Sequence, residues 1–528
     1  MASTDGSPWF YPDVVSARPG ETVAIHASSA DGPCSLRVTR IGADRVEVAR
    51  FDGIAVEDLP IPADADADGC GWPVVFHFEV GADWRSGYHD LELVDADGSS
   101  TQHFVCVRPV AGAEPADLLL VLSTNTYQAY NYWGGCNSYA DVDGIMSGSV
   151  SATERATGIG RLSRLRPYPQ SLLVPPEGMH RLVNLELRGP GEFAVPGDRA
   201  WSREHRPTPY DGSAGFVDKW EHRFVEWAEG AGWSIDYATD HDVETDAELF
   251  ADHRCVALVG HSEYWSAEQR RQLDEYVERG GHLAVFSGNT GYWKVRWEDD
   301  GTTLIAHKWA GETDDPLWAD PATRQEATHL WSHPEFGRPE AEVTGLSFLY
   351  GGYHRLVMCV ARGSAAYTVH DHRHWALDGV DVYYGDTIGG EVPLVGYEND
   401  GCPITFDERG LPAPGGGVGV PPNLEIVATA PAMLFEPPES PFPPAIPPEH
   451  PETLARFAYG IDGEAGVERV NRGHAVMASF RKGDGEVFNG GTTEWAHGLA
   501  AGDPYVVAIT ENVLRRFTAT GREDDRRR

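Results

Sequence analysis

One short segment of the 528-residue sequence carries residue types suited to binding a metal ion. It reads Val259-Gly-His-Ser-Glu-Tyr-Trp265 and lies where an apolar run ends and a helical pattern begins. His261 and Glu263 are two residues apart, so in an extended backbone both side chains point to the same side and can hold one ion. The alternative interpretation is structural: Glu263 caps the next helix and His261 packs beside Tyr264.

Ser262 gives the same segment a second chemical interpretation. Between Gly260 and Tyr264 it occupies the position of the nucleophile in the Gly-x-Ser-x-Gly turn of serine hydrolases. Tyr264 stands where that turn has its last glycine and crowds it. In the metal-binding interpretation, Ser262 faces away from the ion.

A tyrosine-rich segment follows another apolar run. It reads Thr124-Asn-Thr-Tyr-Gln-Ala-Tyr-Asn-Tyr-Trp-Gly-Gly135, and its composition predicts a polar aromatic loop. We expect this loop to open on the same sheet edge as His261, because both segments follow a buried strand. Taken alone, Tyr127 and Tyr130 are of a type that more often packs than binds a ligand.

Two more segments carry candidate polar groups, Ser287-Gly-Asn-Thr-Gly-Tyr-Trp293 and Leu394-Val-Gly-Tyr-Glu-Asn-Asp400. Asn289 follows a strand end, where its amide can donate or accept a hydrogen bond in the same cleft; a turn-forming role is the alternative. Glu398 follows an apolar lead-in, and a carboxylate buried there needs a partner or a shifted pKa. The alternative for Glu398 is surface exposure.

The elements that position these residues follow a strand and helix alternation. Apolar runs at 118–122, 255–259 and 282–286 predict buried parallel strands. Helical spacing of apolar residues predicts helices at 216–229 and 267–279. This order indicates a parallel α/β sheet with right-handed crossovers, in which ligands gather at the carboxyl ends of the strands.

Residues 1–110 show a different pattern, with short β-prone runs separated by turns. The runs at 22–26, 35–39 and 74–80 are examples. We predict an antiparallel β-sandwich, packed as an accessory domain on an α/β domain at 111–521. The accessory role follows because no His, Glu or Tyr residues cluster there with ligand spacing.

Three segments are predicted to lack regular structure. Residues 136–215 are too long for a plain loop and are interpreted as a wall or lid over a site. Eight prolines at 437–451 predict an extended strap, and the tail at 522–528 is expected to be frayed. The lid carries the chain's one basic cluster, which either contacts an anionic group or pairs with nearby carboxylates. Its members are Arg155, Arg161, Arg164 and Arg166.

Composition argues against two classes of partner. Lys and Arg number 42 against 81 Asp and Glu, a net charge of −39, which argues against a basic surface for nucleic acid. No apolar run approaches the ~18 residues that span a bilayer, so we expect a soluble protein that does not bind membranes. The start lacks a signal-peptide pattern and the seven cysteines form no Cys-x-x-Cys pair, so we expect a cytoplasmic location with reduced thiols.

Together these segments resemble the large (beta) subunit of N,N-dimethylformamidase and its relatives. The similarity runs from about residue 118 to 517 and includes Gly485-Glu-Val-Phe-Asn-Gly-Gly-Thr-Thr-Glu-Trp495. The resemblance implies a catalytic α/β domain like that of class I glutamine amidotransferases, preceded by a β-sandwich. This order agrees with the one that the residue patterns predict.

The resemblance also implies a mononuclear iron held by one Tyr, one His and one Glu. Transferred by motif, the His and Glu are His261 and Glu263. The tyrosine is Tyr130, preferred over Tyr127 because the Ala-Tyr-Asn part matches the family better. A phenolate and a carboxylate are hard anionic ligands that favour Fe(III), with zinc as the alternative ion.

The implied reaction is hydrolysis of a C–N bond in a small formamide or related amide by metal-bound hydroxide. Glu398 would act as general base or proton shuttle, and Asn289 would orient the substrate or stabilise the oxyanion. A hydrolase with Ser262 as nucleophile and a non-catalytic ligand-binding module are the alternatives. The family enzyme has a separate small subunit, so we expect such a partner, and a homo-oligomer.

Overall fold

The computed structural model describes residues 7–139, 160–179, 181, 183, 211–356, 363–435 and 450–519. Most of the predicted lid and proline-rich strap, Arg155, Cys359 and the predicted tail lie outside these residues. Within the described ranges, no helix is both long and apolar enough to cross a membrane.

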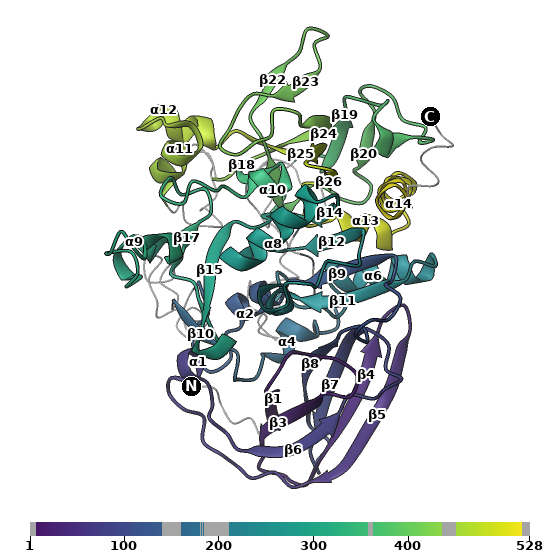
Figure 1. Cartoon of the computed structure of the whole chain (residues 1–528), viewed down its shortest axis with the longest axis vertical. Helices are drawn as coiled ribbons and strands as arrows, with labels where there is room; N and C mark the ends of the chain where they lie inside the picture. The colour runs from purple at the N-terminus through teal and green to yellow at the C-terminus, as the bar shows by residue number, and fades with distance from the viewer. Residues whose placement is uncertain are drawn as a thin grey trace.

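A nine-stranded mixed sheet forms the centre of the molecule (Figure 1). Its strand order is β11-β9-β12-β14-β26-β25-β24-β19-β20. The first five strands are mutually parallel: β11 (Ile235–Thr239), β9 (Leu118–Leu122), β12 (Cys255–Gly260), β14 (His282–Ser287) and β26 (Gly485–Asn489). The other four join antiparallel: β25 (Gly473–Lys482), β24 (Glu425–Ala432), β19 (Ala366–Val369) and β20 (Thr387–Gly389).

The central parallel strands β9, β12 and β14 bury apolar side chains on both faces because helices cover both faces. In β9, Leu118, Leu120 and Leu122 face one apolar cluster, whereas Leu119 and Val121 face another. The first cluster includes helices α6 (Trp220–Gly230), α13 (Trp495–Ala500) and α14 (Pro504–Thr518), and the second includes α7 (Asp240–Thr245) and α8 (Ala267–Glu278). A continuous apolar run is therefore the pattern that such a strand requires.

The strands predicted at 118–122, 255–259 and 282–286 are confirmed as β9, β12 and β14. The predicted helices correspond to α6 and α8, but α6 begins at Trp220 rather than at residue 216. Asp218 has a φ of 56° and Lys219 is extended, which excludes helix before Trp220. The likeness to class I glutamine amidotransferases and the domain boundaries stay predictions.

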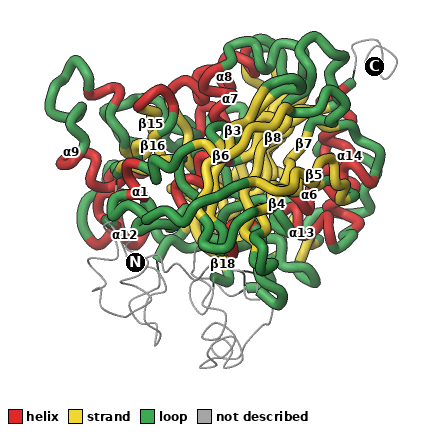
Figure 2. The backbone as a smooth tube through the Cα atoms, turned by 90° about the horizontal axis from the view of Figure 1, so that it is seen from below, coloured by secondary structure: helices red, strands yellow, loops and turns green. Residues whose placement is uncertain are grey.

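Two further sheets form the N-terminal part of the chain (Figure 2). One contains β1 (Trp9–Pro12), β3 (Thr22–Ser28) and β6 (Val74–Glu79); the other contains β2 (Ser16–Ala17), β8 (Ser100–Val107), β7 (Gly87–Val94), β4 (Cys34–Ile41) and β5 (Arg45–Ile54). All pairs except β2 with β8 are antiparallel, and both sheets bury side chains in one apolar cluster. The predicted strands at 22–26, 35–39 and 74–80 correspond to β3, β4 and β6, while the sandwich class stays a prediction.

The N-terminal sheets share a core with the α/β body. Tyr88 of β7 stacks on Phe216 with ring centroids 4.3 Å apart, and both belong to the cluster that contains Leu120 of β9. Arg40 of β4 forms a mostly buried ion pair with Glu229 of α6. The two parts are therefore joined by a continuous apolar core as well as by charges.

Smaller elements surround the carboxyl ends of the parallel strands. Helix α2 (Thr124–Tyr130) follows β9, which corrects the predicted loop, since helix continues until Asn131 turns extended and two glycines follow. The strands are β13 (Tyr264–Ser266), β15 (Trp293–Glu298), β16 (Thr303–Ile305), β10 (Arg161–Ser163), β17 (His329–Leu330), β18 (Ser347–His354), β21 (Tyr397–Gly401), β22 (Ile404–Phe406) and β23 (Pro412–Pro414). The helices are α1 (Ala65–Asp68), α4 (Gln170–Leu173), α9 (Gly311–Asp314), α10 (Ala341–Thr344), α11 (Pro451–Tyr459) and α12 (Glu464–Val470).

Candidate functional site

Helix α2 presents one of its two candidate tyrosines to the H-x-E segment. The Tyr130 hydroxyl lies 3.2 Å from His261 Nε2 and 3.1 Å from Glu263 Oε2. Tyr127, three residues earlier, instead donates its hydroxyl to Glu221. Of the two candidates, the structure brings only Tyr130 to His261 and Glu263.

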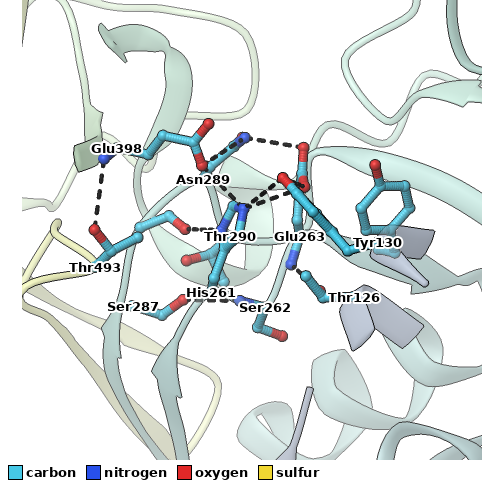
Figure 3. A network of polar contacts seen from close by, with 12 residues as sticks. Thr126, Tyr130, His261, Ser262, Glu263, Ser287, Asn289, Thr290, Glu398 and Thr493 are labelled. Carbon is cyan, nitrogen blue, oxygen red and sulfur yellow. Dashed lines mark hydrogen bonds and ion pairs between the residues drawn. The ribbon is translucent and has the colours of Figure 1, made fainter. Parts of the chain in front are cut away.

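The H-x-E segment connects the end of β12 to the start of β13. It first turns at Gly260, which has a φ of 77° and whose added Cβ would lie 2.6 Å from Cβ of Trp220, so only glycine fits there. His261 Nε2 and Glu263 Oε2 then lie 3.2 Å apart on one side, as their spacing predicts. Ser262 points away from this group (Figure 3), and its Oγ accepts a hydrogen bond from Trp265 Nε1 at 2.9 Å.

The three donor atoms of Tyr130, His261 and Glu263 form a nearly equilateral triangle with sides of 3.1 to 3.2 Å. Ligands about 2.1 Å from a single ion are separated by about 3.0 to 3.4 Å in octahedral or tetrahedral sites. The His261 Nδ1 lies 3.2 Å from the Gly288 carbonyl oxygen, to which it donates. In the neutral ring that a metal ion requires, this bond leaves the Nε2 lone pair directed at the triangle, so the residues fit one metal ion.

Glu398, on β21, reaches the same group from the opposite side. Its Oε2 lies 3.0 Å from His261 Nε2. The Asn289 Nδ2 lies between the two carboxylates (Figure 3), donating to Glu263 Oε1 at 3.2 Å and to Glu398 Oε2 at 3.4 Å. Both amide hydrogens are thereby used, and Asn289 Oδ1 is buried without a partner among the described residues. An acceptor at the site therefore remains for a water or a substrate.

Asp400, two residues after Glu398, holds Asn289 in place. The backbone N–H groups of Asn289 and Thr290 donate to the Asp400 carboxylate at 2.9 and 3.1 Å. Asn289 has a φ of 52°, a left-handed conformation that costs free energy in a non-glycine residue. The carboxylate offsets this cost by accepting both bonds in a fully buried position.

Tyr139 is a further site residue, which the sequence patterns assigned to the lid. Its hydroxyl donates to Glu263 Oε1 and Oε2 at 3.0 and 3.1 Å and lies 3.1 Å from the Tyr130 hydroxyl. The Tyr264 hydroxyl donates to the Tyr139 hydroxyl oxygen at 2.9 Å. The chain turns back toward α2 before Tyr139, where the Ser138 N–H donates to the Ala129 carbonyl. Gly134 and Gly135, both with positive φ, were the signal for this turn in the sequence.

Lys308 and Trp293 complete the surroundings of Glu263. Trp293 Nε1 donates to Glu263 Oε1 at 2.8 Å. The Lys308 ammonium lies 3.1 Å from the centre of the Tyr139 ring and 4.9 Å from that of Trp293. A buried cation over an aromatic face is stabilised by the electrons of the ring.

Burial controls the electrostatics of the site, because the side chains of His261, Glu263 and Glu398 are at most 5% exposed. Burial raises the pKa of the Tyr130 and Tyr139 phenols well above the usual range. Burial also raises the pKa of Glu398, against the opposing charge of His261. For Glu263, burial is outweighed by the charge and hydrogen bond of His261, which hold its pKa below the usual range. Such an excess of acidic groups over one imidazole suits a bound cation.

A second cluster, formed by Glu312, His329 and His333, brings three ligand-type atoms within 4.8 Å of one another. His333 Nε2 lies 3.0 Å from Glu312 Oε1. However, the Nδ1 atoms of His329 and His333 accept backbone N–H groups, at 2.8 and 3.1 Å. Neutral rings in that arrangement carry their proton on Nε2 and have no lone pair for an ion, so we assign no metal there.

Comparison with known proteins gave one family match. The family model described as "N,N-dimethylformamidase beta subunit-like, C-terminal" matches residues 35–507, which is most of the chain and includes every site residue above. A comparison with curated proteins found no match.

Proposed function

The chain belongs to the N,N-dimethylformamidase beta subunit-like family, and from this premise we propose that it is a metal-dependent hydrolase of a C–N bond in a small amide. The observation that carries the proposal is the triangle of donor atoms from Tyr130, His261 and Glu263, with sides of 3.1 to 3.2 Å. A phenol, an imidazole and a carboxylate around one point suit Fe(III), with zinc as the alternative.

Tyr139 is proposed as a further ligand of the same ion. Its oxygen lies 3.1 Å from that of Tyr130 and 3.0 Å from the nearer oxygen of Glu263. Two phenolates beside a carboxylate are hard ligands, which favour Fe(III) over softer ions.

When bound, the ion would supply Lewis-acid chemistry, polarising an amide carbonyl and lowering the pKa of a water molecule. Glu398 is proposed as the group that takes and returns the proton, since its raised pKa suits exchange near neutral pH. Asn289 is proposed to orient the reactants. Because both its N–H groups face carboxylates, the free Oδ1 supports a role as acceptor rather than as oxyanion donor.

The family description names a beta subunit, which supports a separate partner subunit for this chain. A dimethylformamide-like substrate, a cytoplasmic location and a homo-oligomer belong to the same proposal.

The test is metal analysis, a visible spectrum and amine release from small formamides by purified protein. We expect one iron per chain and a phenolate-to-iron charge-transfer band. Tyr130→Phe should weaken or shift this band, whereas Tyr127→Phe, on the same helix but bonded to Glu221, should keep it. A colourless zinc-loaded active protein would overturn the iron assignment alone. Loss of turnover in Ser262→Ala, together with full turnover in wild-type protein shown by metal analysis to be metal-free, would replace the proposal with a serine mechanism.

A further inference from the structure

The segment from Asn131 to Tyr139 connects two of the proposed ligands without forming a helix or an extended strand. It leaves α2 after Tyr130 and turns back so that the Tyr139 hydroxyl meets Glu263. A non-repetitive segment has no helical ladder to fix its course. Its conformation therefore depends on a few turn bonds, such as that from the Ser138 N–H to the Ala129 carbonyl, and on the groups that bond its backbone from outside.

Arg166 supplies one set of these bonds from within the protein. Its guanidinium donates to the carbonyl oxygens of Trp133 at 2.6 Å and Asn131 at 2.9 Å, while its Nε donates to Ser163 at 3.0 Å. The side chain is completely buried. The predicted pairing of the basic cluster with carboxylates applies to Arg161, which bonds Asp68 and Asp299, but Arg166 bonds backbone carbonyls instead.

Asp66 supplies the opposite contact from the N-terminal part of the chain. It lies in the single-turn helix α1, and its Oδ2 accepts the backbone N–H of Cys136 at 2.7 Å. The approach is close, because a Cβ added to Gly135 would lie 2.4 Å from the same Oδ2. Arg166 and Asp66 thus hold the carbonyl and amide groups of one segment from two sides.

Apolar contacts fix the same segment against the N-terminal sheets. The Trp133 ring lies 5.9 Å from that of Trp72 and 5.6 Å from that of Trp9. Trp133 and Trp72 belong to one buried cluster with Tyr11 of β1. The N-terminal residues thus contact the chain only a few residues before Tyr139.

We propose that Asp66 and Arg166 are positioning residues that place the Tyr139 hydroxyl at the metal site, so that the N-terminal sheets complete the site rather than serve as a separate accessory. This inference rests on the proposed function, because Tyr139 is there a metal ligand. Neither residue touches the reacting atoms, and both act through the backbone of residues 131–136.

The first test compares three variants within the α1 turn. Asp66→Ala removes the acceptor for Cys136 N–H, Asp66→Asn keeps an acceptor oxygen, and Asp68→Ala removes a surface carboxylate whose side chain is 59% exposed. Loss of support around a ligand typically lowers metal affinity about 10 to 100-fold. We expect this loss of metal affinity in Asp66→Ala alone of the three variants. Its phenolate-to-iron charge-transfer band should also shift toward that of Tyr139→Phe. Unchanged affinity and band in Asp66→Ala would overturn the proposal.

A second measurement separates this proposal from the proposed function. In metal-free protein, hydrogen exchange at the Cys136 amide should quicken at least 10-fold in Asp66→Ala but not in Asp66→Asn or Asp68→Ala. Arg166→Lys keeps the charge but is shorter and lacks the planar set of donors with which Arg166 reaches Ser163, Trp133 and Asn131, so it should quicken exchange across residues 131–139. If the wild type bound no metal, the proposed function would fail. The hydrogen-exchange rates would still show whether Asp66 and Arg166 hold the backbone of residues 131–139. Unchanged exchange in both Asp66→Ala and Arg166→Lys would refute these positioning roles.

Discussion

Glu263 and Glu398 are both buried, yet their hydrogen-bond partners suit them to different tasks. Glu263 Oε1 accepts from Tyr139, Trp293 and Asn289, and Oε2 accepts from Tyr130, so both oxygens are fixed. The Glu398 carboxylate accepts from Asn289 and lies beside His261, so fewer groups fix it. A fixed carboxylate suits a metal ligand, whereas a carboxylate with a raised pKa suits proton transfer.

Glu398→Gln is therefore expected to keep full iron occupancy and lose about 10² to 10⁴ of kcat, the usual cost of removing a general base. Glu263→Gln should lose iron first, and its loss of activity should follow the loss of metal. Metal analysis and kcat on the same preparations check both expectations. Equal iron loss in the two variants would contradict the division of roles.

Asp240 is another buried carboxylate, not bonded to the proposed ligands, whose titration is linked to stability. Burial raises its pKa from 3.8 to about 8, although Asn125 N and Gln269 Nε2 donate to it. Between about pH 4 and pH 8 the folded state therefore binds more protons than the unfolded state. The free energy of unfolding contributed by Asp240 is therefore greatest below pH 4 and is lost as the pH rises through about 8.

Asp240→Asn should accordingly flatten the pH dependence of the free energy of unfolding between about pH 4 and 8, by up to about 1.4 kcal/mol per pH unit. Urea unfolding at several pH values measures this slope. Asp407→Asn is the control, because the Leu411 N–H holds the pKa of that partly exposed carboxyl below its usual value. A slope unchanged in Asp240→Asn would show that the group is charged in the folded state.

At the level of elements, β21 and the loop after β14 act as one unit. Asp400 on β21 accepts two backbone bonds from the loop and so holds Asn289 in its left-handed conformation. Glu398 lies on the same strand, so one short element positions both groups. The strand thus couples a proton-transfer group to a substrate-orienting group.

Asp400→Ala should lower kcat about 10²-fold, the scale of effect expected when a reacting group is displaced by about 1 Å. Iron occupancy should remain, because Tyr130, His261 and Glu263 are not bonded to Asp400. Asp400→Asn keeps one acceptor oxygen and should lose less activity. If Asp400→Ala lost its iron, Asp400 would instead be a residue that holds the metal ligands in position.

The elements predicted from sequence were those with a strong repeating pattern. Strands β9 and β12 and the interior of β14, residues 283–286, are apolar because helices cover both faces, and that pattern is visible in the residues. The spacing of His261 and Glu263 likewise placed both side chains on one side. A strand end singled out Asn289 and an apolar lead-in singled out Glu398, but only the motif resemblance assigned both to one site, because they lie far apart in sequence.

What the sequence did not predict depends on tertiary contacts. The α2 segment has the composition of a loop, but its residues form a buried helix between β9 and the H-x-E segment, where Thr126 Oγ1 accepts Glu263 N–H. The backbone between α2 and Tyr139 is bonded by Arg166 and Asp66, which come from distant parts of the chain. No local periodicity encodes such contacts.

At the level of the whole molecule, the shared core joins the N-terminal sheets to the α/β body. Tyr88 stacks on both Phe104 and Phe216, and all three lie in the main apolar cluster. Separating the two parts would expose these rings to water. We therefore expect one cooperative unfolding transition rather than two.

Tyr88→Ala should lower the free energy of unfolding by about 3 to 5 kcal/mol, as for other large aromatic residues truncated in a core. Calorimetry should still show a single transition at a lower temperature. Tyr384→Ala, at a side chain 63% exposed, is the matched control and should change stability little. Two separate transitions in the wild type would indicate that the parts fold independently.

The burial of the site has a kinetic consequence. Tyr130, His261 and Glu263 are each at most 3% exposed, so a chelator cannot reach an ion held among them in the closed state. Release of the ion would then require local opening of the protein. Once the chelator captures the ion faster than the protein closes again, the rate of release would no longer depend on chelator concentration. A half-life for metal loss that stays constant over a wide range of chelator concentration would show that opening limits the rate of release. For the same reason, uptake of the metal ion should be fastest while the chain is still folding.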